Sequence, residues 1–232
     1  MIRHLTESLL PIMRLMLFVL LSLLLIACIP QRPPQEARRA VEIGAPILSD
    51  DFDRAGTWTE VDQDGLLLYV ADDAYNGLLS RPGQFLWGIN RTQHNNAVLE
   101  VDVQFKTTYE RAIAGLICRS SGSGQGYYFL ISADGAFSIR RVGQFEDVPL
   151  VRWQNHRAIH SDGGRRNTIR AICDGSYLGM VVNGVYLDGV EDTQLSDGYT
   201  GLALGLPPSA GTGDYSAVSF YNVRGWASDA GS

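Results

Sequence analysis

The chain has 232 residues, a formal net charge of −6 and a hydrophobic content of 45%. That hydrophobic content is ordinary for a globular protein, so a mainly disordered chain is excluded. The acidic balance argues against a nucleic-acid partner and against a polybasic membrane patch, because both need clustered positive charge.

The N-terminus has the layout of a secretory signal peptide. Arg3, His4 and Arg14 form a mildly basic start, and residues 15–27 follow as an uncharged apolar run. At ~1.5 Å per residue, a helix of that length is shorter than the ~30 Å hydrocarbon core of a membrane. A cleaved signal is therefore favoured over a spanning anchor.

The end of this apolar run predicts a lipid anchor. Residues 25–28, Leu-Ile-Ala-Cys, resemble the lipobox of bacterial lipoproteins. The resemblance implies that residues 1–27 are removed as a signal peptide and that Cys28 is acylated, with two or three chains giving a lasting membrane anchor. We expect a lipid-anchored protein of the cell envelope, on the extracytoplasmic side of a bacterial membrane. The alternative is a chance cysteine at the end of a signal peptide or anchor.

The rest of the chain divides into a tether, one domain and a tail. Residues 28–46 are rich in Pro, Gln and charged residues, which predicts a flexible tether that starts at the lipidated cysteine. Residues 47–226 have the pattern of a folded domain, and their number suits a single all-β domain. Residues 227–232 are expected to form a disordered tail.

The folded segment consists of short strand-like runs separated by turn signals. Residues 100–105 alternate polar and apolar side chains, which is typical of a half-buried strand. Asp134-Gly135 and Asn183-Gly184 each stand between two such runs and predict β-hairpins. No long stretch after the signal segment has a convincing helical period. The pattern predicts an all-β fold of antiparallel sheets, a sandwich or a barrel.

Two cysteines remain if Cys28 is lipidated. Cys118 and Cys173 each stand at the end of an apolar, strand-like run and are followed by turn residues. Outside the cytoplasm, an even pair of this kind favours a disulfide. Two buried free thiols are the alternative.

A resemblance to a known family lies in the segments 48–52 with Trp58, 99–103, 115–119, 127–132 with 134–135, 167–173, 182–184, 197–198 with 201–202, and 218–223. These segments resemble the concanavalin A-like jelly roll, and they are also similar to laminin-G-like modules and 3-keto-disaccharide hydrolase-like domains. The resemblance implies a two-sheet antiparallel β-sandwich with adjacent first and last strands. One sheet is usually concave, and its face or rim binds sugar chains in relatives. Tyr221 departs from the pattern, because relatives often have Asp there.

Glycoside hydrolysis is the enzymatic reading that the resemblance suggests. Glucanases of this fold carry Glu-x-Asp-x-Glu, or a variant with one more spacer, on the catalytic strand. The nearest match is Glu100 with Asp102, but the second glutamate is replaced by Gln104 or, in the other register, Phe105. A retaining mechanism needs two carboxyl groups ~5–5.5 Å apart, and an amide cannot donate the proton. We interpret this run as the polar side of an ordinary strand and assign no catalytic residue.

Calcium is the one cofactor that the sequence suggests. Asp50, Asp51 and Asp53 could contribute to a site, since calcium prefers six to eight hard oxygen ligands. The alternative is that these acids serve only as turn and strand-end residues.

The histidines and paired arginines suggest no site. His156 and His160 flank a strand-like or loop segment, where four residues span ~13 Å and cannot share one metal ion. His94 lies in a polar run and is expected to be exposed. The arginine pairs at 140–141 and 165–166 are interpreted as solvated surface.

Aromatic residues are the remaining candidates for a ligand site, because sugar recognition combines an apolar platform with a few polar groups. Trp87 and Trp153 are favoured, since both lie beside polar, loop-like stretches; Tyr75, Tyr109 and Tyr177 are further candidates. We expect a membrane-anchored, non-catalytic binding or adhesion module whose partners are glycans or other cell-surface polymers. The alternatives are a glycoside hydrolase acting on a modified (3-keto) disaccharide or glucoside, and a structural envelope protein.

Overall fold

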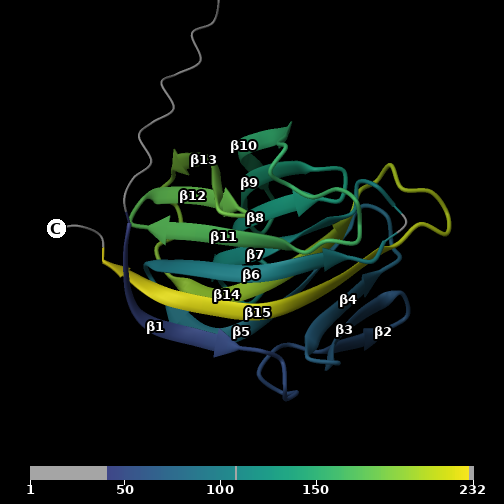
Figure 1. Ribbon diagram of the computed structural model, residues 1–232, viewed down its shortest axis with the longest axis horizontal. Coiled ribbons are helices and arrows are strands. Elements are labelled where there is room, and N and C mark those ends of the chain that lie inside the picture. The colour runs from purple at the N-terminus through teal and green to yellow at the C-terminus, as the bar shows by residue number, and fades with distance from the viewer. Residues whose placement is uncertain (1–40, 108, 230–232) are drawn as a thin grey trace, which may run out of the picture. The chain divides into compact units, whose positions relative to one another are not determined.

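A computed structural model describes residues 41–107 and 109–229, and these residues form fifteen strands and no helix (Figure 1). No helical segment that could cross a lipid bilayer is found in this part of the chain. The predicted signal peptide, Cys28 and most of the predicted tether lie outside the described residues. The strands are β1 (Glu42–Asp50), β2 (Val61–Gln63), β3 (Leu66–Ala71), β4 (Ala74–Leu79), β5 (Gln84–His94), β6 (Ala97–Phe105), β7 (Ile113–Ser120), β8 (Gly126–Ser132), β9 (Ala136–Val142), β10 (Asp147–Asn155), β11 (Asn167–Asp174), β12 (Tyr177–Val182), β13 (Val185–Glu191), β14 (Gly198–Leu206) and β15 (Ser216–Asp229).

The strands form two antiparallel sheets, which confirms the predicted sandwich. The nine-stranded sheet has the order β13-β12-β11-β6-β15-β4-β3-β2, with β1 also paired to β15. The six-stranded sheet has the order β10-β9-β8-β7-β14-β5. In Figure 1 the nine-stranded sheet faces the viewer and the six-stranded sheet lies behind it.

Side-chain alternation along the strands builds the core between the sheets. In β6, every second residue from Leu99 to Phe105 is buried, while the residues between them are partly exposed. Leu116 and Phe129 point into the same core from the six-stranded sheet. This period of two residues is what the sequence pattern predicted for a half-buried strand.

Turn chemistry sets the two predicted hairpins. Asp134-Gly135 joins β8 to β9, and Asn183-Gly184 joins β12 to β13. Asn183 and Gly184 have φ values of 51° and 76°, as the two central residues of a tight type I′ turn require.

The first and last strands are adjacent, and they are longer than predicted. Glu42 pairs with Asp229 and Pro46 with Trp226, so residues 42–46 belong to β1 and residues 227–229 to β15. The predicted domain bounds of 47 and 226 were therefore wrong. Proline suggested a tether, but Pro46 lies at a register irregularity in an edge strand, where a missing N–H is tolerated.

The predicted disulfide is confirmed. Cys118 of β7 and Cys173 of β11 are bonded, with their Cα atoms 6.9 Å apart. Because β7 and β11 belong to different sheets, the bond joins the two layers across the core.

Candidate functional site

The outer face of the six-stranded sheet carries a second apolar cluster. β7 and β8 are buried along their whole length, so both of their faces are covered. The core residues of these strands alternate with Ile117, Tyr128 and Leu130, which pack together on the opposite face with Ala203 of β14. Trp87 of β5 packs against the edge of this cluster. Tyr128 and Leu130 of this cluster, with Ile113 of β7, form part of the floor of the candidate site.

Two adjoining hollows open on this face. The first has a volume of about 640 Å³ and contains Phe85 from β5 and Trp153 from β10 in its walls. The second has a volume of about 570 Å³ and is bordered by Trp87. Both hollows are lined by Phe85, Arg140 and Asp147, so they form one groove across the sheet. The first hollow is also lined by the polar residues Arg111, Ser132, Asp134, Gln154 and Asn155.

An ion pair lies where the two hollows meet. Nε of Arg140 lies 2.6 Å from Oδ1 of Asp147, and the Asp147 side chain is 47% exposed. The pair therefore places a charged donor beside a charged acceptor at the surface of the groove. Such an arrangement suits a ligand whose neighbouring groups both donate and accept hydrogen bonds.

A second carboxylate lines the first hollow. The hydroxyl of Ser132 donates a hydrogen bond to Asp134 and accepts one of 3.1 Å from the Ala136 N–H. These contacts hold the turn between β8 and β9. They also fix the Asp134 carboxylate as an acceptor at the end of the groove.

The aromatic side chains of the groove differ in how much of each ring is accessible. Phe85 is 37% exposed and Trp153 is 38% exposed, so both present a ring to solvent. The Phe85 ring meets the Tyr128 ring edge to face at 6.3 Å. Trp87 is partly covered by the loop between β7 and β8, because a Cβ on Gly124 would lie 2.6 Å from its ring.

Tyr128 holds that loop in place. Its hydroxyl donates a hydrogen bond of 2.7 Å to the carbonyl oxygen of Gly124. Burial raises the pKa of Tyr128 above its usual range, and the charge of Asp147 adds to this effect. The hydroxyl therefore remains a neutral donor at physiological pH.

The structure separates the five aromatic candidates. Trp87 and Trp153 both line the groove. The proposal of Tyr75 was wrong, because this residue is fully buried and packs against core rings, with its hydroxyl bonded to the backbone. Tyr109 lies outside both hollows and shares a 2.8 Å hydrogen bond with Ser209. Tyr177 is 8% exposed, and its hydroxyl bonds to another tyrosine hydroxyl.

Sequence reasoning missed Phe85, Arg140 and Asp147 as site residues. Arg140 was interpreted as solvated surface, and Phe85 was not distinguished from core aromatics. One signal was present: residues 85–89 include apolar side chains on both faces of a strand. A strand that is apolar on its solvent side indicates a covered or functional face.

The acidic run near the first strand does not gather into a metal cluster. Asp50 accepts hydrogen bonds from the Phe52 N–H at 2.8 Å and from the Trp58 indole at 3.0 Å, so it fixes the turn after β1. Asp51 pairs with Arg224, and Asp53 lies near an exposed arginine. Within residues 41–107 and 109–229, no three His, Cys, Asp or Glu side chains could hold one metal ion. Calcium binding remains a prediction of the sequence alone.

The glucanase-like run lies on the other sheet. Glu100 forms an ion pair of 2.7 Å with Arg170, and Asp102 accepts hydrogen bonds from Thr168 at 2.6 Å and Asn222 at 2.8 Å. Gln104 donates to the carbonyl oxygen of Gly164. These contacts link neighbouring strands and a loop, as expected for the polar side of an ordinary strand.

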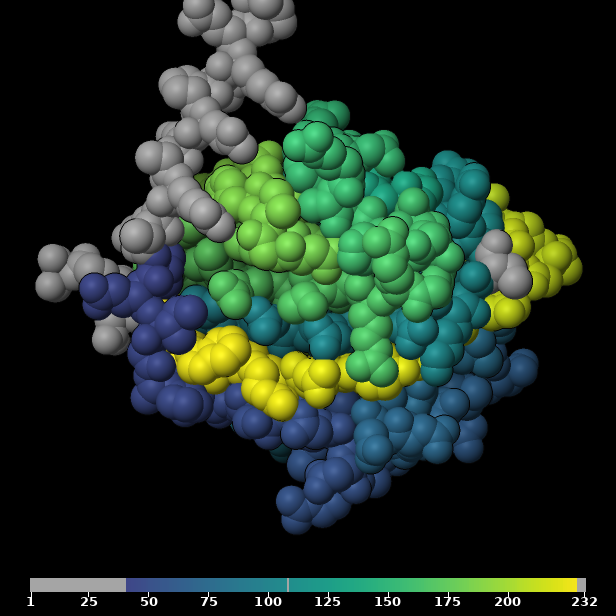
Figure 2. Space-filling model, in the orientation of Figure 1, coloured from purple at the N-terminus to yellow at the C-terminus, as the bar shows by residue number. Residues whose placement is uncertain are grey.

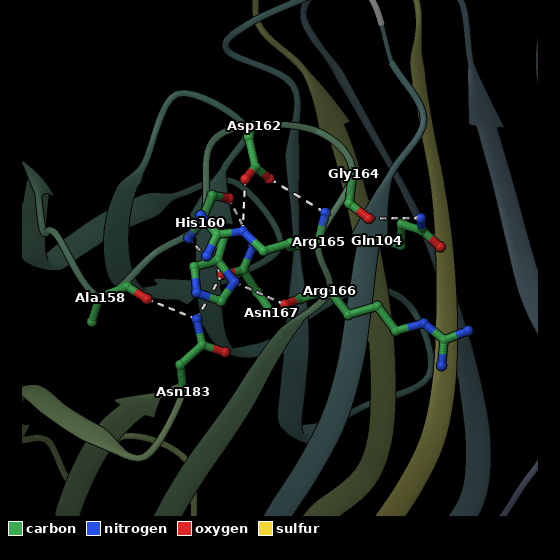
Figure 3. A network of polar contacts seen from close by, with 9 residues as sticks. All are labelled: Gln104, Ala158, His160, Asp162, Gly164, Arg165, Arg166, Asn167 and Asn183. Atoms are coloured by element: carbon green, nitrogen blue, oxygen red, sulfur yellow. Dashed lines mark hydrogen bonds and ion pairs between the residues drawn. The ribbon is translucent and has the colours of Figure 1, made fainter.

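A polar network shapes the loop that precedes β11 (Figure 3). The His160 N–H donates to the Asn167 side chain at 2.8 Å, which in turn donates to the His160 carbonyl at 2.9 Å. Asn183 ties this loop to the β12–β13 turn through Ala158 at 2.7 Å. The loop is therefore a fixed element, although its two histidines do not form a metal site.

The loop before β11 contacts Tyr221, the residue that departs from the family pattern. Figure 2 shows the green segment before β11 reaching across the outer face of the nine-stranded sheet to the yellow β15. There the Arg166 guanidinium lies 3.5 Å above the centre of the Tyr221 ring. Tyr221 therefore serves as a stacking platform for Arg166, which remains an exposed surface residue as the sequence predicted.

His94 is buried, so its expected exposure was wrong. It is 6% exposed, and neither ring nitrogen has a hydrogen-bond partner among the described residues. The nearby Arg119 is also buried and is tied to the carbonyl oxygens of Asn95, Leu195 and Gly175 at 2.8 Å each. Within this polar run, therefore, the His94 side chain is buried, and Arg119 of β7 bonds to the backbone beside it.

Comparison with known proteins identifies the fold. No protein-family model matches the chain, and no curated protein matches it significantly. Among solved structures, the carbohydrate-binding module CBM66 from Bacillus subtilis is 14% identical, with a TM-score of 0.59 over 74% of this chain and 96% of that one.

Two other solved structures agree with this result. A protein with a galectin-like fold from Bacillus subtilis is 11% identical, with a TM-score of 0.57, and the match covers 82% of this chain and 99% of that one. A β-1,3-1,4-glucanase derived from a mouse hindgut metagenome is 9% identical, with a TM-score of 0.58 over 78% of this chain and 98% of that one. The described domain has the concanavalin A-like jelly-roll fold that the sequence predicted.

Proposed function

We propose that this jelly roll is a glycan-binding module and that the groove on its six-stranded sheet is the binding site. One observation carries the proposal: two exposed aromatic rings, Phe85 and Trp153, border the same open hollow as the Arg140–Asp147 ion pair. Binding sites commonly combine an apolar surface with a few fixed polar groups. The fold is shared with a solved carbohydrate-binding module and a glucanase, which supports the same class of ligand.

The chemistry of a sugar fits both parts of the groove. One face of a pyranose ring is lined by C–H groups, which pack on an aromatic ring such as that of Trp153. The hydroxyls around the ring both donate and accept, so one sugar can bond to the Arg140 guanidinium and the Asp147 carboxylate together. Gln154 and Asn155 add neutral donors and acceptors along the same wall.

Binding should depend on the exposed rings of the groove. We expect the full chain, purified in mild detergent, to be retained by at least one member of a panel of laminarin, levan, xylan, mannan, pectin, alginate and chitin. The Trp153→Ala variant should bind about 3- to 10-fold more weakly, because an aromatic contact contributes about 0.5–1.5 kcal/mol. Affinity electrophoresis and titration calorimetry would measure this loss.

Tyr69→Ala is the matched control for that experiment. Tyr69 is an exposed aromatic residue of β3, on the other sheet, and is 45% exposed. Its replacement should leave binding unchanged. Equal losses in the two variants would contradict the assignment of the groove, and a chain that no polysaccharide retains would favour a structural role in the envelope.

We further propose that the module is held on the membrane through Cys28, as the lipobox-like segment suggests. Metabolic labelling with a palmitate analogue should label the wild-type chain. The Cys28→Ala variant should remain unlabelled and unprocessed, because the thioether that carries the diacylglycerol needs the thiol. Normal labelling of this variant would refute the anchor.

Hydrolysis of a modified glycoside is the second candidate, because Asp134 and Asp147 line the same hollow. Glycosidases use two carboxyl groups on either side of the scissile bond. Here both carboxyl groups already accept hydrogen bonds within the protein, so we favour the binding function over the hydrolytic one. Sugar release from 3-keto-glucosides that survives purification and is lost in Asp134→Asn would favour the hydrolytic function over binding alone.

A further inference from the structure

The exposed aromatic rings are unevenly distributed over the two sheets. Of the described residues, four aromatic side chains are strongly exposed: Tyr69, Phe85, Phe145 and Trp153. Phe85 and Trp153 border the groove of the six-stranded sheet. Phe145 lies in the turn between β9 and β10 and is 93% exposed, so its ring contributes almost nothing to the core.

The turn that carries Phe145 is held in a fixed shape. The Gly143 N–H donates a hydrogen bond of 2.8 Å to the carbonyl oxygen of Glu146, which closes the turn. Arg141 lies 3.6 Å from the Glu146 carboxylate and also forms an ion pair with Asp192. Phe145 is therefore presented to solvent by an anchored turn.

Phe145 borders a third hollow that continues the groove. This hollow has a volume of about 530 Å³. It shares Gln125, Val142, Gly143 and Gln144 with the second hollow, just as the second shares Phe85 with the first. The three hollows thus form a row that ends beyond the β9–β10 turn, where Arg141, Gln194 and Leu195 line the third hollow.

The row of hollows is too long for one small ligand to fill. Trp153 lies six residues beyond Asp147, the first residue of β10. Two register shifts in β10 place Trp153 opposite the stretch between Phe137 and Ile139, so at ~3.3 Å per paired residue it lies roughly 15 Å from Asp147 and farther from the Phe145 turn. A mono- or disaccharide is too short to contact both ends of such a row.

We infer that the groove binds an internal stretch of a linear polysaccharide, with Trp153, Phe85 and Phe145 as successive ring contacts. This inference rests on the proposed glycan-binding function and extends it from a sugar class to a mode of binding. Three observations support it: the hollows share walls, polar side chains such as Arg140 and Gln144 alternate with the rings, and the exposed Phe145 is not needed by the fold.

Oligosaccharide ladders test the inference. The full chain would be titrated with β-1,3-gluco-, β-1,4-gluco-, xylo-, manno- and fructo-oligosaccharides, each from the disaccharide to the octasaccharide. For any series that binds, the affinity should rise with length until the chain spans the groove. Phe145→Ala should weaken binding of the octasaccharide about fivefold or more and leave the disaccharide affinity unchanged. Tyr69→Ala should alter neither.

The outcomes separate the inference from the function on which it rests. If no series and no polysaccharide binds, the proposed function fails as well. If affinity is independent of length and Phe145→Ala has no effect, the site binds a chain end, so the inference fails while the proposed function stands. If wild-type chains sediment as dimers and Phe145→Ala chains as monomers, Phe145 is a self-association contact and the inference is overturned. The variant should fold normally, because the side chain is almost wholly exposed.

Discussion

At the scale of single residues, His94 is a titratable side chain buried where its charged form is strongly disfavoured. Its ring has no hydrogen-bond partner among the described residues. Burial, with a smaller contribution from the Arg119 charge, lowers the pKa of His94 to about 4. An unfolded histidine has a pKa near 6.5. The folded chain therefore keeps this ring neutral at a pH at which the unfolded chain protonates it.

This difference predicts an acid-sensitive stability. The contribution of His94 is fully present above pH ~6.5 and is lost as the pH falls towards about 4, because the unfolded state binds the proton first. The loss amounts to roughly 3 kcal/mol over this range. We expect His94→Leu to lose less stability than the wild type between pH 7.5 and pH 4.5, as measured by thermal unfolding. Both proteins contain the same carboxyl groups, so parallel pH profiles would show that His94 does not carry the effect.

Residue type alone did not decide which aromatics serve the site. Tyr75 and Trp153 both belong to strands, but Tyr75 points between the sheets and Trp153 points into the groove. The alternation of a strand shows that successive residues face opposite sides. It does not show which side is the core until the neighbouring strands are known.

At the scale of elements, local chemistry predicted the hairpins well. Asn183 and Gly184 favour positive φ values, so the residues of the turn themselves specify its conformation. The termini were harder to predict, because Glu42 becomes a strand residue only through pairing with the far end of the chain. The loop before β11 is similar, since its shape depends on Asn183 and on Tyr221 from other strands.

At the scale of the whole molecule, the Cys118–Cys173 bond is the covalent link between the sheets among the described residues. It closes a loop with a sequence separation of 55 residues. In the chain-entropy account, a loop of that length contributes about 4 kcal/mol by restricting the unfolded state.

Loss of the bond should therefore lower stability markedly. We expect the double variant Cys118→Ser with Cys173→Ser to unfold about 10 °C below the wild type, measured by scanning calorimetry. A reducing agent should lower the wild-type midpoint by a similar amount and leave the double variant unchanged. Equal midpoints for both oxidised proteins would contradict a stabilising role.

The sequence by itself determined the all-β class, the two central hairpins and the jelly-roll resemblance, and it favoured a disulfide over two free thiols. The all-β class and the hairpins follow from alternation and turn residues at neighbouring positions of the chain. The jelly roll was indicated by a family resemblance, and the disulfide by the placement of two cysteines at the ends of strand-like runs. The lipid anchor at Cys28 also comes from the sequence and remains a prediction.

The groove was decided only by the tertiary structure. It forms because β5, β9 and β10 come to lie in one sheet, so that Phe85, Arg140 and Trp153 surround the same hollow although they are far apart in the chain. Pairing between distant strands depends on packing of the whole sandwich rather than on local pattern. For the same reason, the exposure of Phe145 and the burial of His94 became evident only when the sheets were assembled.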